Sequence, residues 1–320
     1  GRCFSKIVTG TGSPGVVFAS VTKAGGFPAL AAAKGHPQAN GPVGVFKSID
    51  GGVTWTHLVG GGLPALDATD LVIDPTNPDR VYAAIGHIFG SPDNGIYMTQ
   101  NAGATWTRLT TGLPTGLSGR ISLAIAPSNP ARLYAVFVNP ADANGGGANT
   151  RGAFRSDNAG STWTSIPVGS FQSSYGWYLS VITVQPTNPD VVFMGGLTLR
   201  RSTNAGASWS TVTPPHVDMH AFAWTANGQL LSGNDGGLHR SPNLGGSWSG
   251  LNNGLGLIQF YAGFSTHPFS TGIMFGGMQD NGSAVRSAAG AWTHAIGGDG
   301  GWSQIDQNNP LISLSLIHIS

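Results

Sequence analysis

Three aspartates in the second half of the chain have the sequence context of catalytic or ligand-binding carboxylates. Asp235, Asp280 and Asp299 lie in the segments GNDGG, QDNG and GGDGG, where glycine or asparagine flanks each of them. A pair of such carboxylates can supply the general acid and general base of a hydrolase. Carboxylate and carbonyl oxygens also bind divalent cations, and aspartate beside glycine is common as a turn cap. The residues alone leave these three interpretations open.

A second group of candidates is formed by His216, Asp218 and His220 in the segment HVDMH. Side chains at i, i+2 and i+4 share one face of a β-strand, so a strand here would present all three together. Two imidazoles and a carboxylate suit a transition metal, and the alternative is a hydrogen-bonded polar row without metal. We therefore expect no obligatory cofactor, with a divalent cation as the alternative.

Aromatic residues near these motifs are candidates for a platform that contacts a sugar. Such rings offer a large apolar surface, although packing in a β-sheet core explains aromatic residues equally well. The candidates are Tyr175, Trp177, Tyr178, Phe260, Tyr261 and Trp302.

An internal repeat indicates which elements position these residues. The pattern Ser/Thr-x-Asp/Asn-x-Gly-x-Thr/Ser-Trp occurs in five full copies, SIDGGVTW, TQNAGATW, SDNAGSTW, STNAGASW and SPNLGGSW, and in a shortened copy, RSAAGAW. The third residue can accept hydrogen bonds from backbone N–H groups in a tight turn, and glycine permits a positive φ. Four full copies have Asn at the third position, which keeps the acceptor and removes the acid. We therefore interpret the repeat as structural.

Apolar strands run between the copies of the repeat. Several are joined by Pro-Thr/Ser-Asn-Pro, a signature of a hairpin loop. Each repeat then has four strands, the number in one blade of a β-propeller. We predict an all-β propeller with six four-stranded blades at residues 4–59, 69–110, 118–167, 179–213, 217–251 and 258–294, and the start of a seventh from Gly301.

The predicted domain organisation is one propeller at residues 1–312, truncated at both ends. Residues 313–320, SLSLIHIS, break the earlier pattern and resemble translated adapter sequence. We expect a non-native tail there, and the alternative is an interrupted β-strand. The chain begins without Met or a signal-peptide pattern, so we expect a fragment of a secreted protein, extracellular or on the cell surface, without its leader.

Composition limits the partners. The net charge is +1, only 9% of residues are charged, and the chain has no basic run, so nucleic acid is not expected as a partner. We find no apolar run of about 20 residues, so we do not expect membrane insertion. All 14 acidic residues are aspartate, which excludes chemistry that needs a glutamate within this segment.

The copies of the eight-residue repeat, the octets, resemble the Asp-box (BNR) repeats of sialidases, sortilin-type receptors and xyloglucanase-type glycoside hydrolases. The segments GWYLSVITVQPTNPDVVFMGG, HVDMHAFAW, GNDGG, QDNG and GGDGG are similar to a group of secreted bacterial propellers with these repeats. The resemblance extends from Ser5 to Pro310 and implies a carbohydrate-active hydrolase with aspartate as acid and base, acting on a polysaccharide or glycoprotein. Leu179 departs from it, because the resemblance leads us to expect Asp there.

The resemblance also separates the classes of function. A sialidase fits poorly, because that family needs a glutamate and this chain has none. Xyloglucanase-type enzymes place their cleft between two propellers, so this hypothesis implies a second propeller domain outside the chain. The alternative is a non-catalytic, sortilin-like propeller that binds a protein or glycan ligand at its rim.

Overall fold

The computed structural model describes residues 2–10, 15–23, 41–256, 259–261 and 265–315, and every regular element in them is a β-strand. Within these described ranges, six four-stranded sheets of consecutive strands are followed by a two-stranded sheet. Neighbouring strands pair antiparallel, as Val81 does with Thr99 and Leu133 with Ser156. The prediction of an all-β propeller with six blades and the start of a seventh is confirmed.

The strands have the following bounds, sheet by sheet. The first sheet contains β1 (Arg2–Thr9), β2 (Val17–Lys23), β3 (Gly44–Ser48) and β4 (Thr56–Leu58), and the second contains β5 (Ala68–Asp74), β6 (Asn77–Ile85), β7 (Gly95–Thr99) and β8 (Thr107–Leu109). The third contains β9 (Ile121–Ala126), β10 (Asn129–Val138), β11 (Thr150–Ser156) and β12 (Thr164–Ile166), and the fourth contains β13 (Val181–Val184), β14 (Val192–Gly195), β15 (Leu199–Ser202) and β16 (Ser210–Val212). The fifth contains β17 (Met219–Trp224), β18 (Leu230–Asn234), β19 (Gly237–Ser241) and β20 (Ser249–Gly250), and the sixth contains β21 (Ser265–His267), β22 (Ser270–Gly277), β23 (Ser283–Arg286) and β24 (Trp292–Ile296). The two-stranded sheet contains β25 (Ser303–Ile305) and β26 (Ser313–Ser315).

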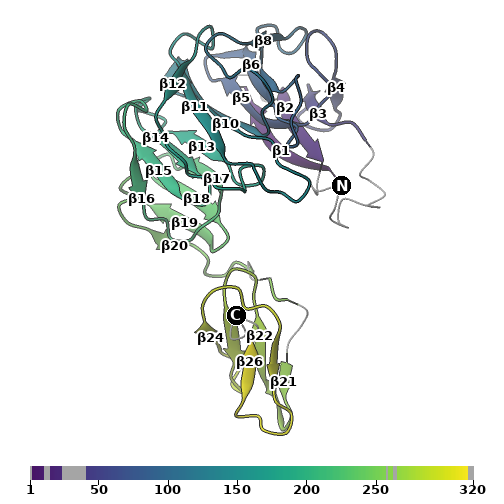
Figure 1. The fold of residues 1–320 in the computed structure, drawn as a ribbon, viewed down its shortest axis with the longest axis vertical. Helices are drawn as coiled ribbons and strands as arrows, with labels where there is room; N and C mark the ends of the chain where they lie inside the picture. Colours follow the sequence, from purple (N-terminus) through teal and green to yellow (C-terminus); the bar gives the residue numbers. More distant parts are fainter. Residues whose placement is uncertain (1, 11–14, 24–40, 257–258, 262–264, 316–320) are drawn as a thin grey trace. The chain divides into compact units, whose positions relative to one another are not determined.

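The chain divides into two compact units, which are described separately below. The first unit contains Gly1–Ser232 and Arg240–Trp248, and the second contains Gly233–His239 and Ser249–Ser320. In the first unit, the first strands of successive sheets contact each other in the order β1, β5, β9, β13 and β17 (Figure 1). In the second unit, β21 contacts β25 in the same way. This contact between first strands is the arrangement of propeller blades.

The predicted tail contributes to the second unit. Its first three residues, Ser313–Ser315, form β26 and pair with Ser303–Ile305. Residues 316–320 lie outside the described residues. The non-native origin of the tail stays a prediction.

Buried apolar side chains gather between neighbouring sheets. Phe18 of the first sheet shares a buried cluster with Val81 and Trp106 of the second. Tyr134 of the third sheet shares another with Val192 of the fourth. Each blade therefore depends on its neighbour to bury its apolar face.

The repeated octet forms the tight turn before the last strand of a sheet. In the second sheet, Asn101 Oδ1 accepts hydrogen bonds from the Thr99 hydroxyl and the Thr105 N–H, at 2.8 and 2.9 Å. The Trp106 indole donates to the Gly103 carbonyl at 3.2 Å. The N–H bond to the third residue recurs in the other four full copies. Asn thus performs the same acceptor role as Asp in this turn.

The fourth residue of the turn connects each sheet to the preceding one. In four copies it is a non-glycine residue with φ between 53° and 56°. Its carbonyl oxygen accepts a hydrogen bond from a basic or tyrosine side chain of the preceding sheet. The four bonds run from Lys47 to Ala102, Tyr82 to Ala159, Arg155 to Ala205 and Arg201 to Leu244, at 2.8, 3.0, 2.7 and 2.8 Å.

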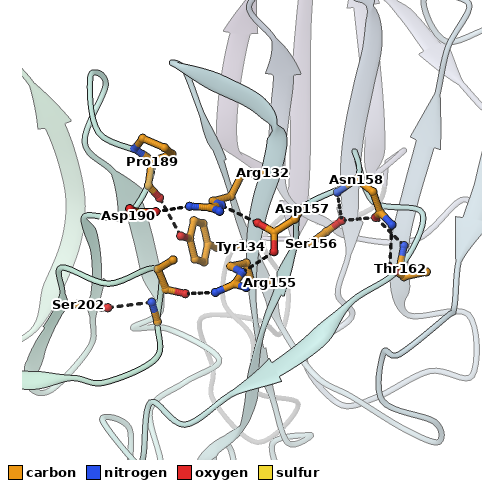
Figure 2. A network of polar contacts seen from close by, with 12 residues as sticks. Arg132, Tyr134, Arg155, Ser156, Asp157, Asn158, Thr162, Pro189, Asp190 and Ser202 are labelled. Carbon is orange, nitrogen blue, oxygen red and sulfur yellow. Dashed lines mark hydrogen bonds and ion pairs between the residues drawn. The ribbon is translucent and has the colours of Figure 1, made fainter.

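An arginine network joins the third and fourth sheets (Figure 2). Arg132 Nε donates to Asp157 at 2.6 Å, and Arg132 also pairs with Asp190 of the following sheet. Arg155 donates to the second oxygen of Asp157 at 2.8 Å. Burial raises the pKa of Asp157, but the hydrogen bonds and charges of Arg132 and Arg155 outweigh it and lower that pKa overall.

Candidate functional site

Two of the three predicted aspartates are in contact in the second unit. Asp280 follows β22, and Asp299 lies between β24 and β25. The Asp280 main-chain N–H donates to Asp299 Oδ1 at 2.9 Å, and the Tyr261 hydroxyl donates to the same oxygen at 3.2 Å. Two donors on one oxygen fix the orientation of the Asp299 carboxylate, which is exposed.

The glycines of these loops allow the two backbones to touch. A side chain at Gly300 would overlap the carbonyl oxygen of Gly282, and a side chain at Gly277 would overlap Gly301. The Gly300 N–H donates to the Met278 carbonyl at 2.9 Å. Glycine is needed here for close approach of one chain segment to another.

Asp235 joins the same group of loops through an asparagine. It lies in the turn between β18 and β19, where the Gly236 N–H donates to Asn234 Oδ1 at 3.0 Å. The Asn281 side-chain amide donates to the Asp235 main-chain carbonyl at 2.9 Å. Since Asn281 directly follows Asp280, the structure brings the three aspartate-bearing loops together.

A cavity of about 350 Å³ lies beside Asp235. Asp235, Asn281, Trp292 and His294 contribute to its wall, together with apolar atoms of Met278. Trp292 is 42% exposed, and its ring centre lies 5.5 Å from that of Phe260. A carboxylate beside an accessible aromatic pair is an arrangement that can bind and orient a sugar.

The pKa of Tyr261 depends on both neighbouring carboxylates, Asp280 and Asp299. Burial raises its pKa, and so do the hydrogen bond to Asp299 and the charges of Asp299 and Asp280. Its phenol therefore stays protonated at neutral pH and acts as a donor to Asp299. Trp302, also predicted as a ligand contact, is 65% exposed and lies just before β25.

The remaining predicted aromatic residues lie in the first unit, in the loop before β13. Tyr175 and Tyr178 are half-exposed, and the Trp177 ring lies 5.3 Å from Tyr178. The Gly176 N–H donates to the Ala148 carbonyl at 2.9 Å, which ties this loop to its neighbour. The rings are thus presented on a hydrogen-bonded loop.

Leu179, where the resemblance led us to expect Asp, is buried. Its main-chain N–H donates to the Tyr175 carbonyl at 2.6 Å. The side chain at this position therefore packs inside the protein and adds no carboxylate.

The geometry expected for HVDMH is wrong. β17 begins at Met219, so His216 and Asp218 precede the strand, and Asp218 has a φ of 62°. This left-handed residue interrupts the alternation that would put the three side chains on one face. Across the part of the chain that the structure describes, no group of three or more His, Cys, Asp or Glu side chains could hold a metal. His220 instead packs its ring edge-on against Tyr178, at 4.9 Å between centres.

Sequence reasoning missed four residues of the second unit: Asn252, Asn281, Trp292 and His294. Asn252 Oδ1 accepts from the Leu238 N–H at 2.8 Å and helps hold the Asp235 turn. The repeat pattern presents Trp292 as a structural Trp, and the shortened copy RSAAGAW is the local signal that it differs. No local signal marks His294.

No protein-family model matches the chain. It is 22% identical over 229 residues to a probable oligoxyloglucan-reducing end-specific xyloglucanase of Neosartorya fischeri, covering 66% of this chain and 27% of the relative. It is 29% identical over 173 residues to a xyloglucanase of a Paenibacillus species, covering 53% of this chain and 16% of the relative. The chain thus spans well under a third of the length of either curated relative.

Solved structures support the fold. A GH74 xyloglucanase from Xanthomonas campestris superposes with a TM-score of 0.54 at 18% identity, covering 92% of this chain and 45% of that one. An ancestral GH74 enzyme gives a TM-score of 0.54 at 16% identity, covering 94% of this chain and 39% of that one.

In the described residues, no helix has the length and apolarity needed to cross a membrane.

Proposed function

We propose that this chain is part of a secreted glycoside hydrolase of the xyloglucanase type, acting on a β-linked polysaccharide such as xyloglucan. The observation that carries the proposal is the convergence of the Asp235, Asp280 and Asp299 loops beside a cavity walled by Trp292. The similarity to two xyloglucanases supports the substrate class.

In this proposal the carboxylates divide the work of acid and base. Glycoside hydrolysis needs one group to protonate the leaving oxygen and another to activate water or to attack the sugar. Asp235 lines the cavity and is the candidate acid. Asp299, oriented by Tyr261 and the Asp280 N–H, is the candidate base. Asp280 remains the third candidate.

The aromatic residues are assigned to ligand contact. Trp292 lines the cavity of the second unit and Phe260 packs against its ring, with Tyr261 and Trp302 as further candidates. In the first unit, the loop of Tyr175, Trp177 and Tyr178 is proposed as a separate contact for the polysaccharide.

Release of reducing sugar from xyloglucan tests the proposal. Asp235→Asn and Asp299→Asn are expected to lower the rate by at least about a hundredfold, the usual contribution of a general acid or base. Asp142→Asn is a matched control in a first-unit loop, where Asp142 accepts the Asn144 N–H. Equal rates in all four proteins would remove these aspartates from catalysis.

A non-catalytic glycan-binding propeller is the second candidate. It is favoured by the use of Asp299 as a tie between loops, which is a structural role for a carboxylate. Calorimetry with a xyloglucan oligosaccharide separates the two. Binding without sugar release supports the second candidate, and turnover supports the first.

A further inference from the structure

A second cavity, of about 360 Å³, lies in the first unit next to β8 and takes no part in the proposed function. Its apolar wall is formed by Pro92, Leu109, Leu113, Pro114, Leu117 and Phe137. Among the wall residues that the structure describes, Arg108 carries the single ionisable side chain. The cavity therefore combines a mostly apolar surface with one positive charge.

The Arg108 guanidinium is held at the cavity wall. Its Nη2 donates to the Asn94 carbonyl at 2.6 Å. A side chain at Gly95 would come within 2.9 Å of Arg108 Nε, so the arginine lies directly against a backbone without a side chain. Arginine carries five N–H donors in a planar fork, which matches the two oxygens of a carboxylate.

Hydrogen bonds hold the wall of the cavity in place. The Asn94 side-chain amide donates to the carbonyls of Ser118 and His87, at 2.6 and 2.8 Å. The Arg151 guanidinium donates to the carbonyls of Thr115 and Leu117. A preformed wall costs little ordering entropy when a ligand enters.

We propose that this cavity binds a small amphiphilic carboxylate. Its apolar body would contact Leu113 and Leu117, and its carboxylate would pair with Arg108. Charge complementarity selects this class, because among the described residues of the wall the one charge is positive and no side chain is acidic. A bidentate arginine–carboxylate pair gives both affinity and orientation.

Two probes that share a naphthalene ring and differ in their polar group test the proposal: 2-naphthoate and 2-naphthalenemethanol, titrated by calorimetry into the whole chain. The acid is expected to bind at least about tenfold more tightly, the effect of one charge-assisted hydrogen bond. Arg108→Gln is expected to remove this preference and leave the alcohol unaffected. Arg240→Gln, an exposed arginine of β19 outside the cavity wall, is the matched control.

A second variant keeps the test decisive if Arg108→Gln does not fold. Leu117 is 50% exposed, so Leu117→Ala should fold and should weaken the binding of both probes. Equal affinity of the chain for acid and alcohol, or unchanged affinity in the variants, overturns the proposal. Sugar release from xyloglucan is expected to be the same in Leu117→Ala, so this outcome is independent of the proposed hydrolase.

Discussion

The main-chain N–H of Asp280 donates to the Asp299 carboxylate while Asp280 itself has a φ of 58°. Among the described residues, the non-glycine residues with positive φ outside the repeated turn are Asp218 and Asp280. A left-handed backbone costs a non-glycine residue about 1–2 kcal/mol, although Asp tolerates it better than most. Such positions are enriched at functional sites. The hydrogen bond to Asp299 stabilises this strained turn, which lies within the candidate site.

Removing the charge of Asp299 should be visible at Tyr261. Asp299→Asn is expected to lower the raised pKa of Tyr261, because the hydrogen bond and charge of Asp299 contribute to it after burial. The raised pKa stabilises the fold below the ordinary tyrosine value of about 10, and this contribution is lost as pH rises through the folded value. Tyrosinate absorbance, compared with Tyr261→Phe, measures the shift. An unchanged midpoint would contradict the contact.

The first copy of the turn, which has Asp50 at its third position, should make a contribution to stability that depends on acid pH. Hydrogen bonds from the Thr54 hydroxyl and N–H, and then from Ser48, lower the pKa of Asp50 from 3.8 to about 2. This contribution is present above the ordinary pKa and is lost as pH falls through the folded value. Asp50→Asn, which copies the other turns, should remove this dependence. The melting temperatures of the unchanged chain and of Asp50→Asn, measured between about pH 5 and pH 2, should converge or cross. Parallel curves would show that Asp50 makes no pH-dependent contribution to stability.

The same local signals explain why the blades were predictable. The turn closes within eight residues, as from Thr99 to Trp106, so its pattern is complete in the sequence. The hairpin at Pro75 is equally local, because Asp74 Oδ1 accepts from the Thr76 N–H at 2.8 Å. Predicted blade ranges such as 69–110 therefore agree closely with β5 to β8.

The loops of the candidate site depend on contacts distant in sequence, and prediction was weaker there. The spacing in HVDMH predicts that Asp218 lies in a strand. Because its φ is left-handed, β17 begins only at the next residue, Met219. Asn281 bonds to Asp235, which lies 46 residues earlier, and no local pattern marks that pair. The glycines around Asp299 allow a close approach, and the approaching group is another backbone segment distant in sequence.

Substitution by glycine should change the free energy of unfolding differently in two turns that have the same backbone conformation. Ala159 and Leu244 occupy the same turn position, with φ of 53° and 56°. Ala159→Gly relieves strain and should leave the free energy of unfolding unchanged or raise it by up to about 1 kcal/mol. Leu244 packs against a buried cluster, so Leu244→Gly should lower it by about 1–2 kcal/mol. Urea unfolding measures both, and a loss in both variants would show that strain is negligible here.

The arginine network should couple two blades in a pH-dependent way. Arg132→Gln is expected to destabilise by about 1 kcal/mol at neutral pH, because Asp157 is partly exposed and its charge is screened. Because the pKa of Asp157 is lowered, this deficit is present above the ordinary value of about 4 and is lost as pH falls through the lower, folded value. Arg200→Gln, which removes a bond to Thr211, is the control. A deficit that persists at low pH would assign the effect to packing.

Two tryptophans, Trp163 directly before β12 and Trp292 at the start of β24, should separate stability from ligand binding. Trp163 is 4% exposed and packs between sheets, so Trp163→Ala should lower the free energy of unfolding by about 3–5 kcal/mol. Trp292 is 42% exposed in the cavity wall, so Trp292→Ala should cost much less stability and should weaken binding of a xyloglucan oligosaccharide at least about tenfold. Chemical denaturation and calorimetry on both variants test this contrast. If Trp292→Ala binds as well as the unchanged chain, the sugar-binding surface of the second unit does not include this ring.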